Sequence, residues 1–388
     1  MKIKLASNTI PNKHIDNLST WLKKYPKLTK DKLTIDFEEK FSKFLGCSNS
    51  RLVNSGSSAN LLIAAANLYF EKLQTLKIGV PAVSWSTTLS PFMQLGYEPI
   101  LIDCDPINLG INLDHLNEVI KKEKISSLIL VHVLGHDSNV EKIKDICLEN
   151  KIRLFEDSCE ALGSICGKKR LGNYGLASTF SFYYGHHIST IEGGSISSNN
   201  DEFISLITSL RSHGWSRDLE PKISKELKEK YQVSDFRDLY AFYYPGFNLR
   251  STEINAFLGL QQMNVIEDYC TKREFLFNCY KKELFNFWHQ KSNTEFVSAF
   301  AYGTLVENPE EVWLSLKNNG VESRPLICGS MGLQPFWKQK YGGYSSLRYS
   351  DQVHNQGIYL PINADMQTQD VLYVCEKFKK VAKPYFFQ

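Results

Sequence analysis

The chain has 388 residues, of which 43% are hydrophobic and 22% charged, and its formal net charge is +3. These values are typical of a folded globular protein, and the lack of a sustained basic run argues against a nucleic-acid partner. No apolar run reaches the roughly 20 residues that cross a membrane, and the polar N-terminus does not resemble a secretory signal. We therefore expect a cytoplasmic protein without a membrane or nucleic-acid partner.

The length of the chain predicts two domains. The expected division is a large domain over residues 1–260, which opens with a helical segment, and a smaller C-terminal domain over residues 261–388. The second part is rich in helical patterns, and its expected core residues are Phe275, Phe277, Leu284, Phe285 and Trp288.

Apolar strands alternate with helical segments in the first half of the chain, which predicts a mostly parallel sheet covered on both faces. The expected helices run from Asn17 to about Leu45 and from Asn139 to Glu149. Strands are expected at residues 51–54, 99–105, 127–135, 152–155, 178–182 and 195–197.

A Gly-Ser-Ser turn at Gly56, Ser57 and Ser58 separates a short strand from an alanine-rich helix. The free N–H groups of a helix N-terminus, together with two hydroxyls, can bind an anion such as phosphate. Simple capping of the helix explains the same residues.

Two further polar stretches follow predicted strands. Asp157 and Glu160 come directly after the strand at residues 152–155, where α/β proteins place their chemistry. His186 and His187 lie on a turn between two strands, within the run from Ser181 to Gly194. Without other signals, the acidic residues would be surface groups and the histidines ordinary hydrogen-bonding residues.

The run from Ser181 to Gly194 resembles the cofactor motif of the vitamin-B6-dependent sugar aminotransferases of fold type I. That motif has Ser-Phe, three residues, a lysine and then Glu-Gly-Gly. His186 stands here at the position of the lysine. This exchange is the hallmark of one branch of the family, the nucleotide-sugar 3-dehydratases. The resemblance implies an α/β fold: a large domain with a mostly parallel mixed sheet between helices, and a smaller C-terminal α/β domain.

The resemblance also implies the cofactor, pyridoxal 5′-phosphate (PLP) or its amine form, pyridoxamine 5′-phosphate (PMP). Trp85 would stack on the pyridine ring, and Asp157 would face the ring nitrogen. The other cofactor residues that it implies are Gly56, Ser57, Ser58, Glu160, Ser181 and, from the partner of a homodimer, Asn248. His213, Arg250 and Arg324 are the implied substrate-binding residues. The polar stretch from Arg211 to Tyr244 would be a long loop near the site.

Nine cysteines, with no Cys-x-x-Cys or Cys-x-Cys pair, distinguish the chain from a related dehydratase branch that carries an iron–sulfur cluster. We expect no cluster and no metal site. Lys222 to Lys230 mixes lysine with glutamate and predicts a solvated helix face; the alternative is a basic patch for a nucleotide diphosphate.

The expected reaction follows from the exchange of lysine for histidine. Histidine can move protons near neutral pH but cannot tether an aldehyde cofactor. By resemblance, L-glutamate would donate an amino group, and a nucleotide-linked 4-keto-6-deoxy hexose, GDP-4-keto-6-deoxymannose above all, would lose its C3 hydroxyl with release of ammonia and 2-oxoglutarate. The alternatives are a sugar aminotransferase that works with histidine and a silent protein that binds a nucleotide sugar.

Overall fold

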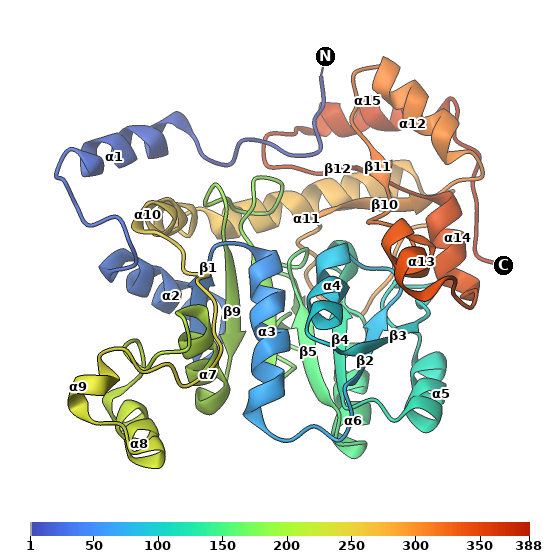
Figure 1. Ribbon diagram of the computed structural model, residues 1–388. Helices are drawn as coiled ribbons and strands as arrows, with labels where there is room; N and C mark the ends of the chain where they lie inside the picture. The colour runs from blue at the N-terminus through green and yellow to red at the C-terminus, as the bar shows by residue number, and fades with distance from the viewer. Residues whose placement is uncertain (1) are drawn as a thin grey trace.

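A computed structural model describes residues 2–388 of the chain. Its centre is a seven-stranded sheet in the order β1-β9-β8-β5-β4-β2-β3 (Figure 1). In chain order these strands are β1 (Asn49–Val53), β2 (Lys77–Pro81), β3 (Glu98–Ile102), β4 (Ser127–Val131), β5 (Arg153–Asp157), β8 (Ala177–Ser181) and β9 (Gly194–Ser198).

The sheet is mixed but mostly parallel. β2, β3, β4, β5 and β8 pair in parallel, whereas β9 is antiparallel to both of its neighbours, β8 and β1. β1 therefore points the same way as β8, and its carboxyl end lies at the same edge as those of the parallel strands. The expected α/β fold with a mostly parallel mixed sheet is confirmed.

Helices cover both faces of this sheet because its strands are apolar on both sides. Along β4, Ile129 packs into one core cluster, and Leu128 and Leu130 pack into the cluster on the opposite face, as the period of two in a strand requires. The first face carries α3 (Gly56–Phe70), α4 (Ser86–Gln94) and α7 (Asp201–Arg211). The second carries α2 (Lys32–Leu45), α5 (Leu113–Glu123), α6 (Val140–Glu149) and α10 (Glu253–Gln262).

The C-terminal part has its own three-stranded antiparallel sheet, in the order β10-β12-β11. Its elements are α11 (Ile266–Glu283), β10 (Ala301–Leu305), α12 (Pro309–Asn318), β11 (Arg324–Pro325), α13 (Pro335–Tyr341), α14 (Arg348–Gln356), β12 (Gly357–Pro361) and α15 (Thr368–Lys379). A separate apolar core joins α11, α12 and α15 to this sheet. The domain division at residue 260 stays a prediction.

The prediction of a buried position is wrong for two residues in this part. Phe275 and Phe285 are 51% and 70% exposed, whereas Phe277, Leu284 and Trp288 are buried. The inward face of α11 is set by residues three or four apart, including Arg273, Leu276, Phe277 and Tyr280, which leaves Phe275 on the outer face.

The remaining elements correct two further expectations. The helical segment expected from Asn17 to Leu45 is two helices, α1 (Asn12–Leu22) and α2. The segment expected to be a loop contains α8 (Pro221–Tyr231) and α9 (Asp235–Asp238), which project from one corner of the molecule (Figure 1). Short elements complete the fold: β6 (Ile165–Cys166), β7 (Lys169–Arg170), η1 (Val133–Gly135) and η2 (Met331–Leu333).

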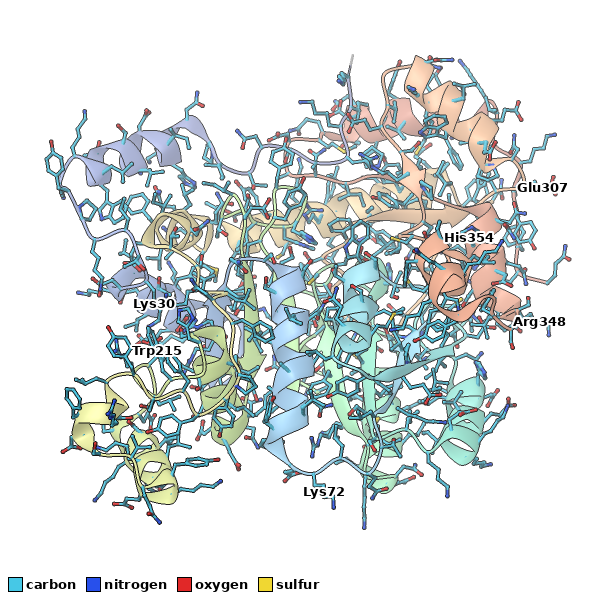
Figure 2. The ribbon with its side chains drawn as sticks, in the orientation of Figure 1. Lys30, Lys72, Trp215, Glu307, Arg348 and His354 are labelled. Carbon is cyan, nitrogen blue, oxygen red and sulfur yellow. The ribbon has the colours of Figure 1, made fainter. Side chains whose placement is uncertain are left out.

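No helix within residues 2–388 combines the length and the apolar character needed to cross a membrane. Figure 2 shows charged side chains such as Lys72, Glu307 and Arg348 distributed around the outside of the molecule.

Candidate active site

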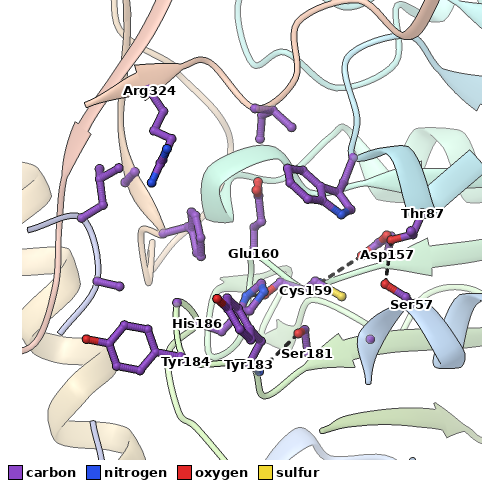
Figure 3. Close-up of a pocket in the computed structure, with 18 of the residues that line it drawn as sticks. Ser57, Thr87, Asp157, Cys159, Glu160, Ser181, Tyr183, Tyr184, His186 and Arg324 are labelled. Carbon is purple, nitrogen blue, oxygen red and sulfur yellow. Dashed lines mark hydrogen bonds between the residues drawn. The ribbon is translucent and has the colours of Figure 1, made fainter. Parts of the chain in front are cut away.

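A cavity of about 770 Å³ opens at the carboxyl ends of the parallel strands, between the large sheet and the C-terminal part. The turns after β1, β2, β5 and β8 each contribute side chains to its wall, because parallel strands bring their carboxyl ends to one edge. Figure 3 shows Ser57, Asp157, Glu160, Ser181, His186 and Arg324 around this cavity.

The N-terminus of α3 forms one end of the cavity. Ser55 caps the helix, since its hydroxyl accepts the Ser58 N–H at 3.0 Å, and α3 begins at Gly56. A Cβ on Gly56 would lie 2.8 Å from Cβ of Ser181 and 3.2 Å from its Oγ. Glycine therefore lets the Ser181 hydroxyl approach the first turn of the helix. Ser57 adds a second hydroxyl, which donates to Thr87 at 3.0 Å.

Asp157 is held at the floor of the cavity by groups from other elements. Its Oδ2 accepts hydrogen bonds from Asn60 Nδ2 at 2.9 Å and from the Thr88 hydroxyl at 2.7 Å. The preceding residue, Glu156, points to the opposite face of the strand. There it accepts backbone N–H groups, including that of Tyr174 at 2.7 Å, and does not line the cavity.

His186 lies in the loop after β8, and one of its two ring nitrogens is hydrogen-bonded to the backbone. Its Nδ1 is 2.9 Å from the carbonyl oxygen of Cys159. A carbonyl only accepts, so Nδ1 carries the proton and Nε2 keeps its lone pair. Burial of the ring, which packs 5.2 Å from that of Phe300, lowers the pKa of His186 to about 4. The imidazole is therefore a neutral base at physiological pH.

The pKa of Glu160 shifts in the opposite direction. Burial raises the pKa of its carboxyl to about 8, and the negative charge of Asp157 adds to the effect. One oxygen, Oε2, accepts the Leu134 N–H at 2.8 Å. Figure 3 shows the carboxyl above His186, directed into the cavity.

Trp85 presents an aromatic surface to the cavity. It is the N-cap residue of α4, after β2, and its side chain is 56% exposed although it lines a cavity. An indole in this position offers a flat surface to a planar ligand.

These groups fit a pyridoxal-type cofactor. A helix N-terminus with the Ser57 and Ser181 hydroxyls suits a phosphate, and a carboxylate at Asp157 suits a protonated ring nitrogen. Because Gly56 has no side chain, Ser181 can pack closely against the first turn of α3 at the phosphate end of the cavity. Among the residues that the structure describes, the lysines that line the cavity are Lys2 and Lys4, from the N-terminal segment. None comes from the loop of His186.

The structure does not bring every expected site residue to this cavity. Gly56, Ser57, Trp85, Asp157, Glu160, Ser181, His186 and Arg324 line it. Ser58 does not, and its hydroxyl instead accepts from that of Ser55 at 2.9 Å. His213 and Arg250 pack on Trp215 outside the cavity, and Asn248 accepts a hydrogen bond from Arg250 there. Their expected roles, like those of the lining residues, stay predictions.

Several residues that organise the site were missed in the sequence. Asn60 and Thr88 position Asp157, the Cys159 carbonyl fixes the tautomer of His186, and Lys2 and Lys4 line the wall. Asn60 alone had a signal, because it is a polar residue directly before the apolar run from Leu61 to Ala66 in α3. The others act through contacts between segments that are distant in the sequence.

Comparison with known proteins supports the same family. The model of the DegT/DnrJ/EryC1/StrS aminotransferase family matches residues 10–379. A GDP-4-keto-6-deoxy-D-mannose 3-dehydratase from Yersinia pseudotuberculosis is 33% identical over 306 residues, which cover 76% of this chain and 77% of the relative.

Two crystal structures of GDP-4-keto-6-deoxymannose-3-dehydratase match the fold over 97% of this chain and 100% of their own. One, a mutant with bound GDP-perosamine, has a TM-score of 0.88 at 25% identity. The other, with a trapped PLP–glutamate geminal diamine, has a TM-score of 0.87 at 26% identity. The resemblance carried by the histidine motif is thus confirmed, and the chain belongs to the DegT/DnrJ/EryC1/StrS aminotransferase family.

Proposed function

We propose that this protein removes the C3 hydroxyl of a nucleotide-linked 4-keto-6-deoxy hexose, with PLP or PMP as cofactor and L-glutamate as amino donor. The proposed substrate is GDP-4-keto-6-deoxy-D-mannose, and the products are GDP-4-keto-3,6-dideoxy-D-mannose, ammonia and 2-oxoglutarate. One observation carries the proposal: His186, with a free Nε2, stands where the family's aminotransferases have a lysine.

The relatives support both the cofactor and the substrate class. Dehydratases of this name match most of the chain, and their solved structures hold a PLP–glutamate adduct or a GDP-linked sugar. When bound, the cofactor supplies an electron-accepting ring and an amine that can join to the C4 ketone of the sugar.

The residues around the cavity would bind and orient the cofactor without a covalent link. The N-terminus of α3, with Ser57 and Ser181, would hold the phosphate. Asp157 would keep the ring nitrogen protonated, and the bonds from Asn60 and Thr88 fix its carboxylate in place. Trp85 would cover one face of the ring.

His186 would move the protons. Its neutral Nε2 would accept a proton from carbon, and the bond from Nδ1–H to the Cys159 carbonyl keeps the ring oriented for this. Because burial lowers its pKa to about 4, the imidazolium that forms is a strong acid and would readily return a proton to the oxygen that leaves C3. Histidine cannot displace the product amine as lysine would, so the unsaturated amine would leave and hydrolyse.

The test is an incubation of the purified protein with PLP, L-glutamate and GDP-4-keto-6-deoxy-D-mannose, with all three products followed together. We expect ammonia and 2-oxoglutarate, and a sugar that lacks its C3 oxygen. His186→Asn should abolish sugar turnover, while binding of PLP, followed by absorbance, should remain. A stable aminosugar formed without ammonia would instead identify an aminotransferase and refute the proposal.

A further inference from the structure

The N-terminal segment forms part of the cavity wall by pairing with the C-terminal part. The Ile3 N–H donates to the Gly320 carbonyl at 2.8 Å, and the Glu322 N–H donates to the Ile3 carbonyl at 2.9 Å. Ile3 is 4% exposed and belongs to the C-terminal core. In an extended segment, the side chains of neighbouring residues point to opposite sides. The burial of Ile3 therefore directs Lys2 and Lys4 together to the other side.

That side is the cavity. Lys2 and Lys4 line it together with Arg324, whose guanidinium points into it from β11 (Figure 3). Among residues 2–388, none of these three cations has a carboxylate within ion-pair distance. Glu322 also lines this wall, and its Oε2 accepts the Leu5 N–H at 3.2 Å. Three cations and one carboxylate leave a net charge of about +2.

Figure 3 shows Arg324 across the cavity from Ser57 and Asp157. The Arg324 guanidinium is thus separated from the end that fits the cofactor. Lys2 and Lys4 also line a second cavity of about 360 Å³, which shares Ala6 and Tyr184 with the first. The parts of a nucleotide sugar have the same order as these features of the cavity. Its sugar would lie at the cofactor end, and its doubly negative diphosphate, which lies between the sugar and the nucleoside, would lie at the cations.

We propose that Lys2, Lys4 and Arg324 form the binding site for the diphosphate of the nucleotide-sugar substrate. This inference rests on the proposed function and assigns a ligand group to residues of the N-terminal segment. The guanidinium of Arg324 can bind phosphate oxygens in pairs, and the two ammonium groups supply point charges beside it.

The alternative basic patch on α8 is a poorer candidate. Lys228 pairs with Asp235, and Lys225 lies 3.7 Å from Glu229, so their charges are compensated locally. None of the residues of α8 lines either cavity. The expected solvated helix face is the better description of this segment.

Isothermal titration of the intact protein with GDP, and in parallel with guanosine, tests the site by binding alone. The Lys2→Ala/Lys4→Ala double variant keeps Ile3, and with it the pairing of the segment. We expect it to bind GDP about tenfold more weakly, as the loss of two partly exposed ion pairs predicts, and guanosine as wild type does. The salt dependence of GDP binding should also fall. Lys23→Ala/Lys24→Ala, which removes two exposed lysines outside both cavities, is the matched control.

Two results would overturn the inference, and they can be told apart. If wild type binds GDP and the Lys2→Ala/Lys4→Ala variant binds it equally well, the diphosphate lies elsewhere and the proposed function still stands. If wild type binds neither GDP nor UDP, CDP and dTDP, the nucleotide-sugar substrate itself is wrong and both proposals fall. Arg324→Gln should weaken GDP binding on its own, and an unchanged affinity would remove that residue from the site.

Discussion

His186 and Glu160 line one cavity, yet burial moves their pKa values in opposite directions, to about 4 and about 8. Both shifts favour the neutral form of the group, since a buried charge is costly. At neutral pH the site thus holds an imidazole that can accept a proton and a carboxyl group that can donate one. Such a pair suits a reaction that moves protons, because the base and the acid are both neutral before the reaction begins.

The raised pKa of Glu160 has a consequence for stability. Between the ordinary carboxyl pKa near 4.5 and about 8, the folded state keeps a proton that the unfolded state has released. Stability is therefore lost as the pH rises through this window. Glu160→Gln removes the titration, and its amide oxygen can still accept the Leu134 N–H. We expect the variant of the cofactor-free protein to be more stable than wild type by roughly 3 kcal/mol at pH 8 and by little at pH 5.

Thermal unfolding from pH 5 to pH 8 measures this difference. Glu118→Gln, an exposed carboxylate on α5 without a hydrogen-bond or ion-pair partner among the described residues, should give a shift that does not grow with pH. A stability gain for Glu160→Gln that is the same at both ends of the range would show that the carboxyl is ionised in the folded protein.

At the scale of elements, the sequence predicted the sheet, and with it the end of the sheet that carries the site. The alternation of strands and helices placed Asp157 and His186 after strands that meet at one edge. It could not place Asn60 and Thr88 against Asp157, because those contacts depend on how α3 and α4 pack on the strands. It indicated the solvated helix face of α8 at Lys222 to Lys230, but the surrounding stretch was expected to be a loop. It missed α9, because this helix has only four residues and none of them is buried.

The junction of α3 with β8 leads to a prediction about the cofactor. A methyl group on Gly56 would meet Ser181 at 2.8 Å and force the hydroxyl or the first turn of α3 to shift. Gly56 does not need a left-handed backbone, so alanine is tolerated by the chain itself. We expect Gly56→Ala to weaken PLP binding about tenfold and to cost roughly 1–3 kcal/mol of stability.

Titration of PLP by absorbance gives the affinity, and thermal unfolding of the cofactor-free protein gives the stability. Gly343→Ala is the control, because a methyl group there meets nothing within 4 Å. Equal PLP affinity for Gly56→Ala and wild type would mean that the phosphate is not held at this helix end.

At the scale of the whole molecule, the chain places its proposed catalytic base in the cavity and some proposed cofactor and substrate contacts outside it. Asn248 is exposed and accepts a hydrogen bond from Arg250 Nε at 3.2 Å. His213 and Arg250 both pack on Trp215, at 5.0 and 5.6 Å from its ring. By resemblance, Asn248 would reach the cofactor of a homodimer partner, and its position outside this chain's own cavity is consistent with such an exchange.

Mixed dimers test whether the site is shared. Asn248→Asp should place a negative charge against the cofactor phosphate of the partner and impair both sites of its homodimer, while its carboxylate can still accept from Arg250. His186→Asn should inactivate its own homodimer. When the two inactive variants are unfolded and refolded together in equal amounts, half of the dimers are mixed, and each has one site with His186 from one subunit and Asn248 from the other. We expect about one quarter of the wild-type dehydratase activity to return.

Because each variant alone stays inactive under the same treatment, recovery requires exchange between subunits. If no activity returns although mixed dimers form, as native mass spectrometry can establish, Asn248 acts within its own subunit or not at all.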